Sequence, residues 1–152
     1  MPSLVGSEMC IRDRCRSAQK VSGRQVHLMM LLGMCATYSP DLHSEDGFEL
    51  PINLRTGVVD EGVWQRWLEN DPVELLDQAT AIKNLKALNC LYVECGNRDQ
   101  YNLHYGARQF TDKLSQNGVS HHYFESDDNH SGTSYRYDVS LPLMLSAMTS
   151  KG

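Results

Sequence analysis

Two short apolar segments flank one amphipathic helix pattern, and this order constrains the fold more than any other feature. The first segment is CLYVEC, residues 90–95, and the second is HHYFE, residues 121–125. Between them, residues 101–117 repeat apolar side chains at spacings of four, three and four, and Gly118 supplies a helix stop. Strand, helix and strand in this order predict two parallel strands joined by a right-handed crossover, which is an α/β arrangement.

The chain before residue 90 is predicted to add one strand and a long surface excursion. The apolar run VHLMMLLGMCATY, residues 26–38, is expected to be a buried core strand. Residues 39–77 are expected to form a lid-like excursion that carries helices, because the stretch 39–58 has no period and contains two Pro and two Gly. Residues 16–152 together are expected to form one partial α/β domain.

Further helices are predicted from their start signals. Asp60 is a favourable N-cap for a helix that follows it. Asp71-Pro72 then opens another helix that extends towards residue 85. An apolar helix at residues 138–148 is expected to end the domain, with Pro142 in its first turn.

Composition narrows the class of protein. Hydrophobic residues make up 41% and charged residues 22% of the 152-residue chain, as in a globular domain. A net charge of −5 argues against a nucleic-acid partner, and the longest apolar run is too short for a membrane span of about 20 residues. The five cysteines are odd in number and lack zinc spacing, so free thiols in a reducing, cytoplasmic setting are expected.

Residues 1–15 form a separate case. MPSLVGSEMCIRDRC has neither a helix period nor a strand period, and it lacks the apolar region of a signal peptide. It resembles the translation of a sequencing adapter and is expected to be an artefact; a disordered natural N-terminus is the alternative. Under either interpretation the segment is expected to stand outside the fold.

Residues able to carry chemistry follow both predicted strands. Asp99 lies in the Gly-containing turn GNRDQ after the first strand, and His130 lies in the loop DDNHSG after the second. Parallel strands place their carboxyl ends at one rim, where the sites of open α/β sheets lie. A carboxylate that holds a histidine Nδ1 is two-thirds of a Ser-His-Asp apparatus, and acid before base is the α/β-hydrolase order. Asp99 is therefore the candidate acid and His130 the candidate base.

Four segments also carry a family resemblance: GFELPINLRTG, VWQRWLENDPVELL, LYVECGNRDQYNLHYGARQF and DDNHSGTSYRYDVSLPL. Together they resemble the esterase family of α/β-hydrolases that includes the esterase D and enterochelin-esterase-like enzymes. The resemblance implies the C-terminal part of an α/β-hydrolase sheet and catalytic roles for Asp99 and His130. It implies a serine esterase whose small-molecule substrates are carboxylic esters or thioesters, with no metal or organic cofactor.

The sequence departs from this family in its nucleophile. The family places a Ser on a G-x-S-x-G elbow, and no such motif occurs. Ser120 and Ser134 each lie two residues after a Gly but lack the second Gly. The departure predicts a C-terminal fragment whose nucleophile and oxyanion hole lie upstream, so that this chain alone is inactive. The alternatives are a non-catalytic binding or assembly domain, and an acyl transferase or peptidase on the same fold.

Local alternatives apply to both nominated residues. Asp99 could instead cap the helix that starts near residue 101, in competition for the same carboxylate oxygens. His130 could be a solvated loop histidine, or could join the two aspartates before it in a cation site.

Two further residues are given supporting positions. Arg136 is expected to hold the His130 loop through an ion pair with Asp138. His104, on the predicted helix, is expected at the surface or beside the site, without a role as the base.

Overall fold

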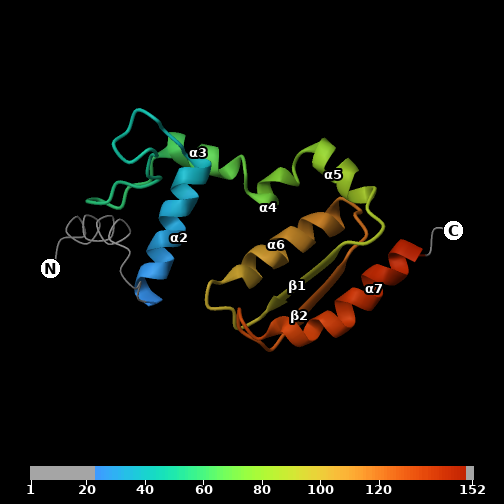
Figure 1. Ribbon diagram of the computed structural model, residues 1–152. Helices are drawn as coiled ribbons and strands as arrows, with labels where there is room; N and C mark the ends of the chain where they lie inside the picture. The colour runs from blue at the N-terminus through green and yellow to red at the C-terminus, as the bar shows by residue number, and fades with distance from the viewer. Residues whose placement is uncertain (1–22, 150–152) are drawn as a thin grey trace. The chain divides into compact units, whose positions relative to one another are not determined.

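The computed structural model describes residues 23–149, and the expectation for residues 1–15 lies outside this range. The described part combines six α-helices, one 3-10 helix and a two-stranded parallel sheet (Figure 1). The chain divides into two compact units at the junction between Asn70 and Asp71. Among the described helices, none has both the length and the apolar character that a membrane span requires.

The prediction of a core strand at residues 26–38 is wrong. This run lies within helix α2, Gly23–Tyr38. Met and Leu are the commonest residues of the run, and Val26 and Thr37 are its only β-branched residues, so intrinsic propensity favours a helix over a strand. Apolar composition without a clear period did not distinguish the two, and length, which favours a helix for so long a run, was the better guide.

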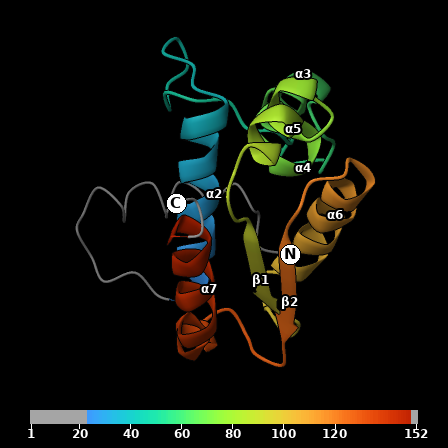
Figure 2. The same cartoon turned by 90° about the vertical axis from the view of Figure 1, so that its right-hand side faces the viewer.

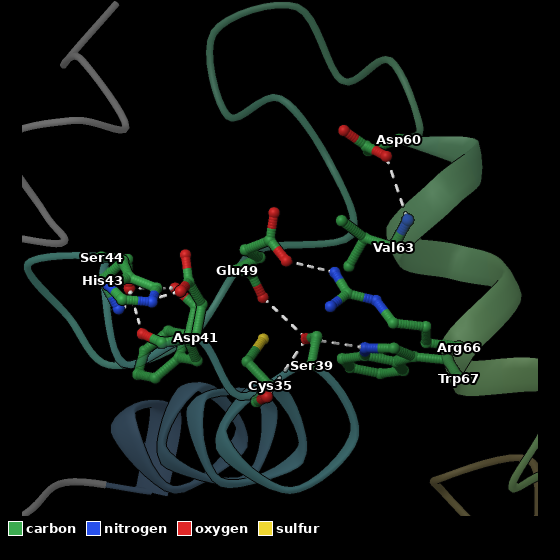
Figure 3. Close-up of polar contacts among 11 residues, drawn as sticks. Cys35, Ser39, Asp41, His43, Ser44, Glu49, Asp60, Val63, Arg66 and Trp67 are labelled. Atoms are coloured by element: carbon green, nitrogen blue, oxygen red, sulfur yellow. Dashed lines mark hydrogen bonds and ion pairs between the residues drawn. The ribbon is translucent and has the colours of Figure 1, made fainter.

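The first unit is organised around a buried serine that follows α2. Ser39 donates a hydrogen bond from its hydroxyl to the carbonyl oxygen of Glu49 and accepts one from the indole N–H of Trp67 (Figure 3). Trp67 belongs to helix α3, Glu61–Leu68, and packs with Cys35 and Val63 in a small apolar cluster. The predicted cap of α3 is confirmed, because Asp60 accepts a hydrogen bond from the backbone N–H of Val63.

The second unit begins with two short helices. Asp71 caps α4, Pro72–Leu75, as predicted, by accepting hydrogen bonds from two backbone N–H groups. The helix does not continue to residue 85, because Gln78 is extended, and a separate helix α5 spans Ala79–Lys86. The core of this unit consists of the buried side chains Leu76, Leu114 and Val119.

The predicted strand-helix-strand unit is confirmed, with each strand shifted by one or two residues. Strand β1, Tyr92–Gly96, pairs in parallel with β2, His122–Ser126. Helix α6, Leu103–Gln116, connects them, and Gly118 takes the positive φ of 63° expected at the helix stop. Asn102 precedes α6 with a φ of 61°, a left-handed conformation that Asn tolerates better than most residues.

The two faces of the sheet carry different helices. Helix α6 lies on one side of the strands, and α7, Tyr137–Thr149, lies on the other (Figure 2). The 3-10 helix η1, Thr133–Arg136, runs directly into α7, so α7 starts earlier than the predicted residue 138. Pro142 therefore lies inside the helix rather than in its first turn. Only Ser140 is buried in α7, whereas α6 buries three side chains.

Candidate active site

Asp99 is held in a tight turn at the carboxyl end of β1. Its backbone N–H donates to the carbonyl of Gly96 at 3.2 Å, and its own carbonyl accepts from the N–H of Asn102 at 3.1 Å. The side chain is 3% exposed. The sequence thus places this carboxylate next to the strand end, and the left-handed Asn102 turns the chain from it into α6.

The loop that carries His130 is tied to the same turn by backbone hydrogen bonds. The N–H of Asn97 donates to the carbonyl of Ser126 at 2.8 Å, and the N–H of Arg98 donates to that of Asp128 at 3.0 Å. Gly96 permits this approach, because a Cβ atom there would lie 2.4 Å from the carbonyl oxygen of Asp128. The β1 turn and the β2 loop therefore form one rim.

Asp99 and His130 are in direct contact at this rim. The Nδ1 atom of His130 lies 2.9 Å from Oδ2 of Asp99. An ionised carboxylate can only accept, so Nδ1 carries the proton and donates it to this hydrogen bond. The neutral imidazole then presents an unprotonated Nε2, which is the atom that a general base uses.

The two roles considered for Asp99 use different oxygen atoms. Oδ1 accepts a hydrogen bond of 2.7 Å from the backbone N–H of Tyr101, while Oδ2 faces His130. Helix α6 begins later, at Leu103, with Asn102 in the cap position. Asp99 therefore shapes the turn before the helix and binds the imidazole at the same time, so the expected competition does not arise.

Electrostatics favour an ionised Asp99. Burial is the largest single influence and raises the pKa of this carboxyl group. The hydrogen bonds from His130 and from the N–H groups of Tyr101 and Leu103, together with the charge of a protonated His130, outweigh it. The net result is a pKa below the ordinary value for Asp. The carboxylate is thus charged at neutral pH and can stabilise the imidazolium that forms when His130 takes up a proton.

Two neighbours of His130 were not predicted from the sequence. The side-chain oxygen of Gln100 accepts the backbone N–H of His130 at 3.2 Å. The ring of Tyr101 meets the imidazole edge-on, with 4.7 Å between ring centres. Both residues directly follow Asp99, so their position beside a candidate acid was the available signal. They restrict the imidazole from the β1 side.

The support predicted for the His130 loop has the wrong partner. Arg136 pairs with Glu94 of β1, with 2.8 Å between Nε and Oε1, and not with Asp138. The hydroxyl of Tyr92 donates to the other oxygen of Glu94 at 2.5 Å. Polar residues inside a strand that otherwise reads as apolar were the available signal for a partner on β1.

The other candidate residues are not drawn together by the structure. Ser120 lies before β2, at the strand end opposite to His130, and Ser134 lies in η1. Neither hydrogen-bonds to His130 within the described range. Asp127 pairs with Arg98 at 3.0 Å, and Asp128 accepts a hydrogen bond from the hydroxyl of Tyr135.

Other features of the described residues bear on ligand binding. Among residues 23–149, no cluster of three His, Cys, Asp or Glu side chains is arranged to hold a metal ion. A polar hollow of about 350 Å³ lies beside the pair, but neither Asp99 nor His130 lines it. His104 is buried in α6, and its Nδ1 has no hydrogen-bond partner in the described part of the chain.

Comparison with known proteins adds no identification. The chain matches no protein-family model and no curated protein. The geometry of the rim is therefore the basis for the functional argument.

Proposed function

We propose that Asp99 and His130 are the acid and base of a serine hydrolase that acts on carboxylic esters or thioesters. One observation carries the proposal: a buried carboxylate lies 2.9 Å from the Nδ1 of a half-exposed imidazole, at the carboxyl ends of adjacent parallel strands. Sites of open α/β sheets lie at this rim. The arrangement favours a partial α/β-hydrolase sheet over a generic mixed fold.

The proposed chemistry follows from the tautomer that Asp99 imposes. Nε2 of His130 accepts the proton of a serine hydroxyl as the oxygen attacks the ester carbonyl. The same atom then returns that proton to the leaving alcohol or thiol. Asp99 orients the ring and stabilises its protonated form throughout. In the described residues, no hydrogen bond engages Nε2, and the imidazole side chain is 45% exposed, so a substrate group can reach it.

The nucleophile in this proposal comes from a segment outside the given sequence. The chain contains no G-x-S-x-G motif. Neither Ser120 nor Ser134 is hydrogen-bonded to His130 in the part of the chain that the structure describes. Strand β1 is hydrogen-bonded on one edge only within the described sheet, so a further parallel strand has a place beside it. The free thiols of Cys35, Cys90 and Cys95 support a reducing, cytoplasmic setting for the complete enzyme.

The test is kinetic and uses the reading frame extended upstream. We expect the extended protein to hydrolyse a small aryl ester and to carry a serine that a fluorophosphonate labels. The His130→Ala and Asp99→Asn variants should each lose at least about a thousandfold in kcat/KM, because base and acid act as one unit with the nucleophile. The 152-residue chain alone should show no turnover.

Matched variants distinguish catalytic loss from general damage. His122→Ala removes an exposed strand histidine, and Asp127→Asn removes an exposed loop carboxylate next to the site. Both should retain activity within a few-fold. Turnover by the 152-residue chain that depends on His130 would contradict the proposal, and so would an upstream frame without a reactive serine. Alcohol or amine acceptors added to the assay separate an esterase from an acyl transferase, because only a transferase moves the acyl group to the acceptor in preference to water. A peptide substrate tests for a peptidase.

A further inference from the structure

The His130 loop is anchored differently at its two ends. On the β2 side, backbone hydrogen bonds to Asn97 and Arg98 hold it against the β1 turn. On the other side the loop runs into η1, which buries no side chain, and then into α7, which buries only Ser140. Apolar packing therefore contributes little to fixing this second end.

One arginine in η1 compensates for this weak packing. The guanidinium of Arg136 lies 4.0 Å from the ring centre of Phe124 on β2. Its Nε donates to Glu94 of β1 at 2.8 Å, and its Nη2 donates to the hydroxyl of Tyr92 at 3.4 Å. Phe124 pairs with Glu94 in the parallel register, so all three partners project from the same sheet face.

The contact is shielded enough to hold a loop in place. The side chains of Arg136 and Glu94 are 16% and 12% exposed, compared with 67% and 79% for the nearby pair of Arg98 and Asp127. A planar guanidinium that stacks on a ring and donates at its edge is fixed in orientation, which a lysine cannot reproduce. The pair of Arg136 and Glu94 is thus firmer than the pair of Arg98 and Asp127.

We infer that Arg136 is a positioning residue, which clamps the carboxyl end of the His130 loop to Glu94, Tyr92 and Phe124 and thereby keeps the imidazole of His130 on Asp99. This inference rests on the proposed function of the Asp99–His130 pair. Without the clamp, the six-residue span from His130 to Tyr135 loses the side-chain contact that ties its far end to the sheet, and the imidazole samples positions away from Oδ2 of Asp99 more often.

The test observes the hydrogen bond itself in the full 152-residue chain. With ¹⁵N-labelled histidine, the Nδ1–H of His130 gives a low-field proton resonance, assigned by its loss in His130→Gln. In Arg136→Met we expect this proton to exchange with water at least tenfold faster, or its resonance to disappear. Arg136→Lys should restore part of the protection, because an ammonium can still pair with Glu94 but cannot stack in the same way.

The matched control is Arg108→Met. Arg108 also pairs with a strand glutamate, Glu125, but on the α6 side of the sheet. This variant should leave the His130 resonance and its exchange rate unchanged, while far-UV circular dichroism shows both variants folded. Should Arg136→Met not fold, Glu94→Gln removes the charge that Arg136 binds and should show the same direction of change.

The outcomes separate the two proposals. An unchanged resonance in Arg136→Met or Glu94→Gln, or equal loss in Arg108→Met, would overturn the positioning role and leave the proposed function intact. Absence of a hydrogen-bonded Nδ1–H in the wild-type chain would overturn the geometry on which both proposals rest.

Discussion

The two faces of the sheet carry the same three residue types in opposite settings. On the α6 side, Tyr123 and Arg108 both donate to Glu125; we call these three residues the α6-side cluster. On the other side, Tyr92 and Arg136 both donate to Glu94; we call these the η1-side cluster. Each strand contributes a Tyr-x-Glu sequence. Arg108 comes from α6, which covers one face, and Arg136 comes from η1, which leads into α7 on the other face.

The clusters differ in what else holds their helix. Arg108 contacts Glu125 through two hydrogen bonds of 2.7 Å, but its side chain is 45% exposed. Helix α6 is already fixed by buried Leu114 and Thr111, so this pair adds to an existing interface. In the η1-side cluster one direct hydrogen bond joins the arginine to the glutamate, where the α6-side cluster has two, but the η1-side pair is less exposed. Helix α7, which continues from η1, buries only Ser140, so few other buried contacts hold this end of the chain. The same chemistry therefore supplements packing on one face and replaces it on the other.

The largest expected effect on stability comes from a substitution at Gly96, where the backbones of the β1 turn and the His130 loop meet. Gly96→Ala places a Cβ 2.4 Å from the carbonyl oxygen of Asp128, so the His130 loop must move. We expect a loss of about 1–3 kcal/mol in the free energy of unfolding, measured by urea denaturation with circular dichroism, and loss of the His130 Nδ1–H resonance. The control is Gly106→Ala in α6, where a Cβ would meet nothing within 4 Å. This change should stabilise the helix by up to about 1 kcal/mol. Equal effects of the two substitutions would contradict the close approach.

Truncating the two arginines tests the comparison directly. Arg136→Met should lower the free energy of unfolding by less than Gly96→Ala but by more than Arg108→Met, because it removes charge-assisted hydrogen bonds in a shielded site. Arg108→Met should lower it only slightly, as is typical of a partly solvated pair. In 1 M NaCl the effect of Arg108→Met should shrink, while that of Arg136→Met persists. Native-state hydrogen exchange of the β1 and β2 amides measures the stability of both variants at low and high salt. A reversed salt response would show that the η1-side cluster is the more solvated one.

Acid titration gives the smallest effect. The hydrogen bonds from Arg108 and then Tyr123 lower the pKa of Glu125 from the ordinary 4.5 to about 2. A lowered pKa in the folded state means that this stabilisation is complete above pH 4.5 and is lost as the pH falls towards 2. The free energy of unfolding should therefore fall through this window in both proteins, and further in the wild type than in Glu125→Gln. The extra loss in the wild type should be at most about 1 kcal/mol. Arg108→Met should resemble Glu125→Gln, and a wild-type decline no steeper than that of the variants would contradict the lowered pKa.

The parts of the fold that sequence predicted are those with strong local signals. Each of these signals specifies a conformation from a few neighbouring residues. They are the helix period of residues 101–117, the caps Asp60 and Asp71, and the stop at Gly118. The prediction of a strand at residues 26–38 was wrong because apolar side chains suit a helix and a strand alike. The choice between the two depends on the intrinsic propensity of the residues. The start of α7 was missed because η1 continues into it without a separate cap.

The contact between Asp99 and His130 was predictable because parallel strands bring their carboxyl ends to one rim. The surroundings of the pair were not. Arg136 reaches 42 residues back to Glu94, and nothing in the local spacing distinguishes that partner from the closer Asp138. Long-range pairing of this kind depends on strand register, which the sequence specifies only once the fold is known.

The divided use of the Asp99 carboxylate narrows what can replace it. A side chain at this position must accept at both ends, from a main-chain amide on one side and from a ring nitrogen on the other. Asparagine offers one acceptor and one donor, so it would turn the imidazole to its other tautomer or release the turn. Glutamate would carry its two oxygens one methylene further out and could not reach both donors without reshaping the bend. The local conformation and the protonation state of the ring are thus decided by a single functional group.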